Sequence, residues 1–578
     1  MQTSVKKPSD LRLVMLWAIV LLGYLLFVVE WFVIDRIAGK PAGILDSNTK
    51  VLPNYDGWVN SFFANSAGSI AGSATNWSIT LLRAVGSVLC GIVVLKFGYR
   101  YAVMIMMGLM CLCFPFLIIG DPLGGNNQLT LLRPLSKEVM GKLSSLSSQL
   151  HEGQLLGPVM AEGKTMLADG QTIDLVQGLD KNLIGTSSSI AGYALFIIFR
   201  STIAIGGTTL VTYSQPLIAS LSTQRRKSVL SNANLWGFNS GIVVAFVPFL
   251  FQSVQQAGTK YWVFILTALI LIGFGILCVF AWFEKQMDPF MPQKQTKEQM
   301  QLGNQPSAGD ILKRKATWKM IGMYGICLVV LVNPLTGGWW NILQAVNPAS
   351  SFNVKDGVKT LKPLEGAGGY FAGLPTLAIL WVLGYGMGYM VFSPFNKTVY
   401  DRKRWLSFMF FMNALMVIVI VLFAATLGVG TAVGFAFVAI ATFIGGSFAW
   451  SMQSTILILP HEFKEYKRSE VSVLFGYIWG FGYVIYTAFD ITNSMFLEAP
   501  KLANPGMKGV SILPGAIAGV ALFAGLLLAA IAIVVTLPSS YLKNGDELVS
   551  EMTKKWKLNQ WQFLVASKEK NRYADLLK

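Results

Sequence analysis

Two arginines lie inside long apolar stretches of the chain, where a charged side chain is unusual. Arg83 falls within residues 78–95, and Arg200 falls within residues 191–207. A guanidinium stays charged at any physiological pH, and near a bilayer centre it costs roughly 2.5–3.5 kcal/mol on the lenient insertion scale. A helix retains such a residue where it faces a partner or a water-filled cavity, so both arginines are candidate substrate-binding residues.

Glu30 offers a second interpretation of Arg83. If the first apolar run leads outward and the second leads back, Glu30 and Arg83 lie at similar depth and can form a structural ion pair. Alternatively, Arg83 faces a central cavity. Because one acid cannot neutralise two arginines, a ligand shared by both arginines would most simply be an anion, whose oxygens suit the bidentate fork of arginine.

Composition indicates that membrane-spanning helices hold these residues. Of 578 residues, 53% are hydrophobic and only 13% are charged, and the mean hydropathy is +0.54. A soluble domain carries about 25% charged residues. The length suits about a dozen helices of roughly 20 residues each. We predict an all-α membrane protein with spans near residues 11–34, 76–96, 101–120, 189–212, 231–252, 261–284, 317–343, 371–392, 405–428, 431–459, 471–494 and 510–538.

The two halves of the chain repeat one pattern. Residues 226–238 and residues 467–481 each begin with two basic residues and a serine and end with Trp-Gly-Phe. Six spans, a polar linker and six more spans are typical of transporters built from two parallel repeats. We therefore expect two pseudo-symmetric six-helix bundles. The predicted divisions are 1–120 (helices 1–3), 121–186 (an external insertion), 187–284 (helices 4–6), 285–316 (the linker), 317–538 (the second bundle) and 539–578 (a basic tail).

The distribution of positive charge predicts orientation and argues against other functions. Lysines and arginines gather in the connectors after even-numbered spans and in both tails, so the positive-inside rule places both termini in the cytoplasm. The net charge of +17 forms no single patch or stripe, so no nucleic-acid partner is expected. No phosphate-binding loop, nucleophile motif or metal-ligand spacing occurs, so we expect neither an enzyme nor a cofactor. The expected partners are the bilayer and a small-molecule substrate, and the expected state is a monomer in the cell membrane.

The second half offers aromatic and amide groups instead of a buried cation. Tyr385, Trp450 and Gln453 lie deepest within their predicted spans and are candidate ligand contacts. The seventh span breaks at residues 333–341, beginning with Asn333-Pro334. Such a break frees backbone carbonyls and is tolerated at membrane depth where it lines a cavity, which makes Asn333 a further candidate.

The chain resembles the major facilitator superfamily in its connectors and in span four. Residues 91–100 are similar to the motif that this superfamily places after its second span: Gly91, Lys96, Gly98 and Arg100 match, while Leu95 replaces its acidic residue. The counterpart in the second half keeps Asp401 and Arg402 but lacks the second glycine. Arg200, followed by small residues, is similar to a motif of span four. The resemblance implies the major facilitator fold and a gating role for these connectors.

Three functions remain in competition. The first is a secondary transporter of a small organic anion, with a sugar phosphate as the leading candidate, because Arg36 loosely resembles the first-span arginine of organophosphate–phosphate antiporters. That family also uses a basic residue in span seven, which is absent here. The second is a proton-coupled carrier of neutral or cationic solutes, with Glu30 as the coupling carboxylate. The third is a transporter-like protein whose segment 121–186 binds a protein partner.

Overall fold

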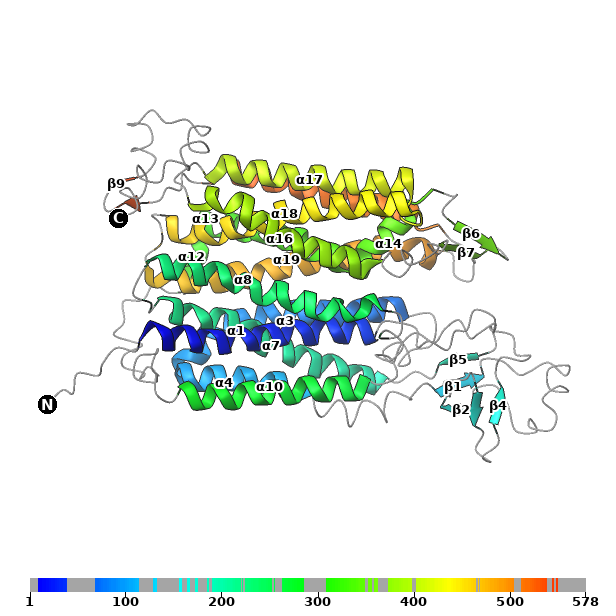
Figure 1. Cartoon of the computed structure of the whole chain (residues 1–578), viewed down its shortest axis with the longest axis horizontal. Coiled ribbons are helices and arrows are strands. Elements are labelled where there is room, and N and C mark those ends of the chain that lie inside the picture. Colours follow the sequence, from blue (N-terminus) through cyan, green and yellow to red (C-terminus); the bar gives the residue numbers. More distant parts are fainter. Residues whose placement is uncertain are drawn as a thin grey trace. The chain divides into compact units, whose positions relative to one another are not determined.

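The computed structural model consists mainly of long helices, with a few short strands (Figure 1). The described helical parts and their flanks are residues 9–38, 68–113, 190–219, 221, 224–251, 254, 262–284, 308–348, 373–397, 402–463, 466, 468–503 and 511–537. The described strands are residues 128–131, 155–158, 164–166, 172–174, 184–186, 352–355, 358–361, 543–544 and 547–548.

Helices occupy all twelve predicted spans. In chain order they are α1 (Asp10–Ala38), α3 (Gly68–Phe97), α4 (Tyr99–Met110) with η1 (Cys111–Cys113), α7 (Ile190–Ala219), α8 (Gln224–Phe246) with η2 (Pro248–Leu250), α10 (Trp262–Glu284), α13 (Lys315–Val332) with η4 (Asn333–Leu335) and α14 (Gly337–Ala345), α16 (Leu374–Lys397), α17 (Arg402–Leu427), α18 (Ala432–Glu462), α19 (Arg468–Ala503) and α20 (Leu513–Val535). The short helix α12 (Ala308–Lys313) precedes α13. The predicted all-α membrane fold is therefore confirmed.

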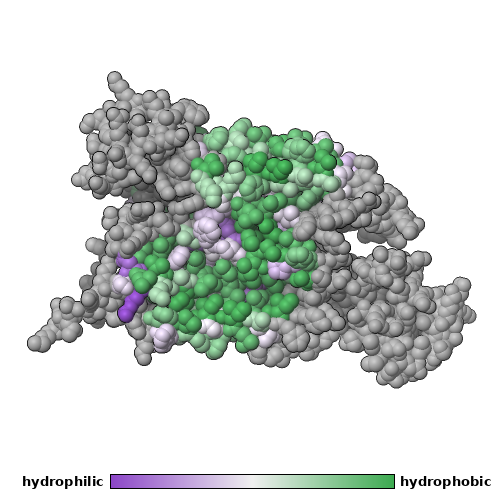
Figure 2. All heavy atoms as spheres, in the orientation of Figure 1, coloured by the Kyte–Doolittle hydropathy of each residue, from purple (hydrophilic) through white to green (hydrophobic). Residues whose placement is uncertain are grey.

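The surfaces of these helices suit a bilayer. Six helices among the described residues are long and apolar enough to cross a membrane: α1, α10, α13, α17, α18 and α20. Hydrophobic side chains cover most of the described surface on the face shown in Figure 2. Large apolar side chains such as Leu271, Trp282 and Met390 are more than half exposed. Contiguous apolar surface of this kind is rare on soluble monomers, and acyl chains would cover it here.

The predicted break in the seventh span is confirmed. The α13 helix ends at Val332, the 3-10 turn η4 follows, and α14 begins at Gly337. Pro334 has no backbone N–H, so it cannot continue the hydrogen-bond ladder of α13. The Thr336 side chain caps α14 by accepting a hydrogen bond from the backbone N–H of Trp339.

Short antiparallel strands, which were not predicted from the sequence, lie outside the spans. In the 121–186 insertion, β1 (Gln128–Leu131) pairs with β2 (Leu155–Pro158) and with β5 (Ile184–Thr186), and β3 (Lys164–Met166) pairs with β4 (Thr172–Asp174). Between α14 and α16, β6 (Phe352–Lys355) pairs with β7 (Val358–Leu361). Near the C-terminal end, β8 (Lys543–Asn544) pairs with β9 (Glu547–Leu548).

The first of two compact units contains residues 1–82, 100–221 and 248–290. Within it, α1 packs along α7 and α10. Two adjacent glycines of α7 allow this close packing. A Cβ atom on Gly207 would overlap the Phe27 ring, and one on Gly206 would overlap the Met106 carbonyl. The glycines therefore bring α7 directly against α1 and α4.

The second unit contains residues 83–99, 222–247 and 291–578. Within it, α16 packs on α18 and on α8, α13 packs on α19, and α17 packs on α18 and α20. Contacts thus group α8 and the C-terminal part of α3 with the second half, whereas the division at 285–316 assigns both to the first. The sequence-based bundle boundaries stay a prediction.

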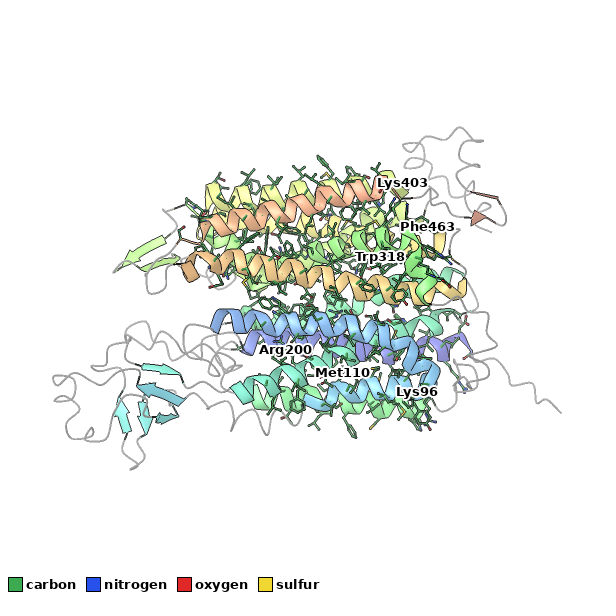
Figure 3. All side chains as sticks on the ribbon, turned by 180° about the vertical axis from the view of Figure 1, so that it is seen from behind. Lys96, Met110, Arg200, Trp318, Lys403 and Phe463 are labelled. Carbon is green, nitrogen blue, oxygen red and sulfur yellow. The ribbon has the colours of Figure 1, made fainter. Side chains whose placement is uncertain are left out.

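Connectors that were expected on one side of the membrane lie at one end of the second unit. Trp318 near the start of α13, Lys403 near the start of α17 and Phe463 after α18 all lie toward this end (Figure 3). This arrangement agrees with an alternating path of the chain through the unit. Which side of the membrane this end faces stays a prediction.

Candidate functional site

Arg83 is fully buried on α3 and stacks on an aromatic ring. Its Cζ lies 4.1 Å from the centroid of the Tyr483 ring on α19, and its exposed fraction is 0%. Further rings continue from this stack: Trp479 lies 6.2 Å from Tyr483 and 5.1 Å from Tyr324 on α13. The negative face of an aromatic ring attracts a cation, and the attraction strengthens when water is excluded. Arg83 was predicted from the sequence, whereas its partner Tyr483 was not.

The stack depends on close packing between α3 and α19. A Cβ atom on Gly476 would lie 3.2 Å from the Ser87 carbonyl oxygen, and one on Gly480 would lie 3.2 Å from the Ala84 carbonyl oxygen. Glycines spaced four residues apart lie on one face of a helix, which lets two backbones approach. This face therefore places the Tyr483 ring within reach of Arg83.

Arg200 is held in a different way, inside the first unit. Its Nη2 donates hydrogen bonds to the Trp31 carbonyl oxygen on α1 and to the Asn76 Oδ1 on α3, both at 3.4 Å. The Trp31 Nε1 donates to the same Asn76 oxygen at 3.2 Å. These contacts join three helices through neutral acceptors. Arg200 lies within α7, where Figure 3 marks it.

Glu30 is buried on α1, beside Trp31 in the sequence. Its exposed fraction is 2%, and its Oε2 atom has no hydrogen-bond partner in the described part of the chain. Glu30 belongs to the first unit and Arg83 to the second. The predicted Glu30–Arg83 ion pair therefore stays a prediction.

Tyr385 and Trp450, both predicted from depth alone, lie together in the second unit. Their ring centroids are 6.4 Å apart in an edge-to-face arrangement. Two rings of α8 complete an aromatic cluster: Trp236 lies 6.0 Å from Tyr385, and Phe238 lies 5.8 Å from Trp450. Trp236 and Phe238 belong to the repeated Trp-Gly-Phe motif, which was noticed as a repeat but not as part of a site.

Two indole hydrogen bonds fix the position of this aromatic cluster. The Trp450 Nε1 donates to the Trp381 carbonyl oxygen at 3.1 Å, and the Trp381 Nε1 donates to the Leu331 carbonyl oxygen at 3.2 Å. A Cβ atom on Gly446 would overlap the backbone of Trp381, so only glycine allows this approach of α18 to α16. The bonds link α18, α16 and the end of α13, two residues before Asn333.

Buried amides supply polar atoms in the same unit. Asn333 on η4 and Asn239 on α8 each have two amide atoms without a hydrogen-bond partner in the described part of the chain, and the Gln453 Oε1 is in the same situation. Buried amides are normally satisfied, so each such atom requires an explanation such as a ligand or water. Asn333 and Gln453 were predicted candidates, whereas Asn239 was missed.

The predicted gating motif surrounds the turn between α3 and α4. Gly91 lies in α3, and Lys96 is exposed at its end (Figure 3), 5.4 Å from the Phe97 ring. Gly98 adopts φ of 79°, a left-handed conformation that favours glycine, and thereby ends α3.

The other charged residues of the predicted gating motif are Arg100, Asp401 and Arg402. Arg100 lies in α4 and belongs to the first unit, and its Cζ is 5.8 Å from the Tyr101 ring. Asp401 lies outside the described residues. Arg402 begins α17, and its side chain is not described.

The fold and the buried polar residues define a multi-pass membrane carrier. The family model of the Mycoplasma MFS transporter matches residues 196–498. A major facilitator superfamily transporter of Mycoplasma genitalium, MG061, is 62% identical over 575 residues, which cover 100% of this chain and 99% of that protein. A second such transporter, from Mycoplasma pneumoniae, is 58% identical and covers 97% of this chain and 100% of its own length. The chain belongs to this Mycoplasma family of major facilitator superfamily transporters.

Solved structures of more distant proteins are similar in fold. The proton:xylose symporter XylE, bound to 6-bromo-6-deoxy-D-glucose, is 14% identical, with a TM-score of 0.49 and coverage of 95% of this chain and 100% of that chain. A partially occluded inward-open structure of the Escherichia coli xylose transporter XylE is 12% identical, with a TM-score of 0.45 and coverage of 93% and 99%. Membership of the Mycoplasma transporter family, and not this more distant likeness, identifies the protein as a transporter of the cell membrane and not an enzyme.

Proposed function

We propose that this transporter moves a small organic anion across the cell membrane, with a sugar phosphate as the leading substrate. The main supporting observation is Arg83, a fully buried guanidinium stacked on Tyr483 within the second unit. A fixed cation in a low-dielectric environment favours an anionic ligand, and a planar guanidinium matches the oxygens of a phosphate or a carboxylate.

The rest of the second unit supports a substrate with a sugar part. Rings such as Tyr385 and Trp450 offer apolar faces, and the amides of Asn333, Asn239 and Gln453 offer hydrogen-bonding atoms that have no protein partner in the described part. A carbohydrate ring has apolar C–H faces and a hydroxyl rim that match these two kinds of group. A carboxylate without a polyol part would use only Arg83.

Both kinds of group adjoin the helix α13. Tyr324 belongs to the aromatic series that begins at Tyr483, and the Leu331 carbonyl accepts the bond that positions Trp381. These positions are seven residues apart, or about 10 Å along a helix. We infer that the phosphate contacts Arg83 and that the sugar contacts the aromatic cluster and the amides.

Uptake into proteoliposomes tests the substrate class. Purified protein is reconstituted and offered radiolabelled glucose 6-phosphate, glucose, or a dicarboxylate. We expect saturable uptake of glucose 6-phosphate and little uptake of glucose. Preference for glucose, with a dependence on an imposed proton gradient, would contradict the anion proposal.

That outcome would favour the second proposed function, a proton-coupled carrier of neutral or cationic solutes. Glu30 supports it, because a buried carboxyl whose Oε2 has no hydrogen-bond partner in the described part can gain and lose a proton during a transport cycle. In this case the arginines are structural. The third function, in which residues 121–186 bind a protein partner, would be supported if deleting that segment left transport intact but removed a complex.

We further propose alternating access by rocking of two halves, with both termini in the cytoplasm. Cysteine labelling of intact cells should modify position 160 from outside, and positions 300 and 570 only after permeabilisation. A single position with the opposite accessibility would contradict the twelve-span orientation. A cross-link between the connectors at 91–100 and 395–404 should also block transport.

A further inference from the structure

We propose that Tyr483 is a positioning residue for the anion site and that its stack with Arg83 couples anion binding to the contact between α3 and α19. The inference rests on the proposed function, because it takes Arg83 as the anion-binding group. It adds a residue, a helix interface and a direction of coupling.

The Tyr483 ring holds the Arg83 guanidinium by one face. With Cζ 4.1 Å from the ring centroid, the Tyr483 ring takes up one face of the Arg83 guanidinium. All five N–H donors of arginine lie in the plane of the group, so a ring on its face blocks none of them. Tyr483 therefore fixes the tilt of the guanidinium without covering its edge, which is where the proposal places the oxygens of the anion.

The second step concerns the rigidity of the ring itself. Tyr483 is buried, and its neighbour Trp479, one turn earlier on α19, packs against Tyr324 of α13. A Cβ atom on Gly482 would lie 2.8 Å from the Tyr324 ring, so α19 and α13 are in close contact here. The ring is thus carried by a packed pair of helices, and it moves when α19 moves.

The third step links the stack to the helix interface. Arg83 belongs to α3 and Tyr483 belongs to α19, and these helices meet through Gly476 and Gly480 at the carbonyls of Ser87 and Ala84. If α3 and α19 separate, Arg83 loses the ring and the orientation that the ring imposes. Arg83 should therefore bind an anion more tightly while the helices are in contact.

Reciprocity follows from linkage. If helix contact strengthens anion binding, anion binding must strengthen helix contact by the same factor. The substrate would thus stabilise the conformation in which α3 and α19 touch. A neutral solute that does not engage Arg83 would lack this effect.

The test compares substitutions at the ring, at the interface and at a remote glycine. Binding of glucose 6-phosphate to purified, folded protein is measured for Tyr483→Phe, Tyr483→Leu, Gly480→Ala and Gly480→Val, with size-exclusion chromatography confirming folding. We expect Tyr483→Phe to keep wild-type affinity, since it keeps the ring. Tyr483→Leu should weaken binding roughly thirtyfold, the scale of a desolvated cation–π contact.

Substitutions at Gly480 test the helix interface without changing the Tyr483 ring. A Cβ atom at this position would lie 3.2 Å from both the Ala84 carbonyl oxygen and a Val88 methyl group. Gly480→Ala should therefore weaken binding mildly and Gly480→Val more strongly, although neither changes Arg83 or Tyr483. The matched control is Gly525→Val on α20, because a Cβ atom there meets nothing within 4 Å, and it should leave affinity unchanged.

A cross-linking experiment tests the reverse direction. Cysteines replace Ser87 and Gly476 in a background without the five native cysteines. A short thiol cross-linker should join them more efficiently with glucose 6-phosphate than with glucose. Arg83→Gln should abolish that difference.

The outcomes distinguish failure of this inference from failure of the proposed function. If wild-type protein binds no glucose 6-phosphate or other organic anion, the proposed function is wrong. If it binds and Arg83→Gln removes binding, while Tyr483→Leu and Gly480→Val keep wild-type affinity, the anion site stands and the coupling through Tyr483 is wrong. A cross-linking yield that is insensitive to glucose 6-phosphate would also overturn the coupling.

Discussion

Arg83 and Arg200 are both buried arginines of membrane-spanning helices, yet their surroundings differ. Arg83 stacks on the Tyr483 ring in the second unit, whereas Arg200 donates to the Trp31 carbonyl and the Asn76 amide oxygen in the first. A stack occupies the face of a guanidinium, and hydrogen bonds occupy its edge. The insertion cost is the same for both residues, so we use their partners, and not their burial, to propose Arg83 as the ligand-binding arginine and Arg200 as a structural one.

Arg83→Gln should have the largest effect on transport. Loss of a charge-assisted interaction worth about 3 kcal/mol would lower glucose 6-phosphate uptake by roughly 100-fold. Uptake into proteoliposomes measures this effect, and the midpoint of thermal unfolding checks that the protein is folded. If Arg83→Gln kept wild-type uptake of glucose 6-phosphate, Arg83 would not be the ligand-binding arginine.

Asn76→Ala should lower stability and leave transport in place. The substitution removes the acceptor shared by Arg200 and Trp31, and unsatisfied buried donors cost about 1–3 kcal/mol. Thermal unfolding in detergent should therefore begin at a lower temperature, with the Michaelis constant for uptake unchanged. The control is Thr208→Val on α7, whose hydroxyl has no hydrogen-bond partner in the described part. If Asn76→Ala abolished uptake without lowering stability, Arg200 would belong to the substrate site.

Trp450→Phe should have a moderate effect that distinguishes the sugar end of the site from Arg83. The variant keeps an aromatic ring but loses the hydrogen bond to the Trp381 carbonyl, a contribution of about 1 kcal/mol. The Michaelis constant for glucose 6-phosphate should rise by roughly fivefold. Inhibition of uptake by inorganic phosphate should not change, because phosphate would contact Arg83 alone. If Trp450→Phe weakened inhibition by inorganic phosphate as much as it weakened uptake of glucose 6-phosphate, the sugar and the phosphate would not have separate contacts. The control is Trp282→Phe, at an exposed position of α10.

Glu30→Gln should have the smallest effect if the substrate is an anion bound by Arg83. The amide is close in size to the carboxyl, and Glu30 lies in the other unit from Arg83. Uptake of glucose 6-phosphate measured from pH 5.5 to 8 should stay within about twofold of wild type at each pH. Loss of proton-driven uptake in this variant would instead identify Glu30 as the coupling carboxylate.

The spans and the break in the seventh span could be predicted because each depends on local sequence. Apolar length marks a spanning helix, and Asn333-Pro334 interrupts one. The partners of the buried polar residues could not be predicted in this way. Tyr483 meets Arg83 because two glycines of α19 allow α3 to approach, and Asn76 meets Arg200 across more than a hundred residues. Such contacts depend on which helices pack together, and one sequence does not contain that information.

The aromatic cluster and the short strands also depend on features that one sequence does not reveal. Depth within a span selected Tyr385 and Trp450, whose rings lie together in the structure. Their neighbours Trp236 and Phe238 come from α8, and these contacts required the three-dimensional arrangement. The strands of the 121–186 insertion are only three or four residues long, too short for an alternating pattern to be recognised. The sequence of residues 132–150 also predicts an amphipathic helix, and these residues lie outside the described part of the chain.

The break after α13 divides this span into two helices with separate hydrogen-bond ladders. Each side is a finished helix: the Asn333 backbone N–H still bonds to the Val329 carbonyl, and Thr336 caps α14 through the Trp339 N–H. Bending at residues 333–336 would therefore leave both hydrogen-bond ladders intact. Because α14 also packs on α19 and α20, a bend at this break would shift α14 together with these neighbours, and α19 is the helix that carries Tyr483.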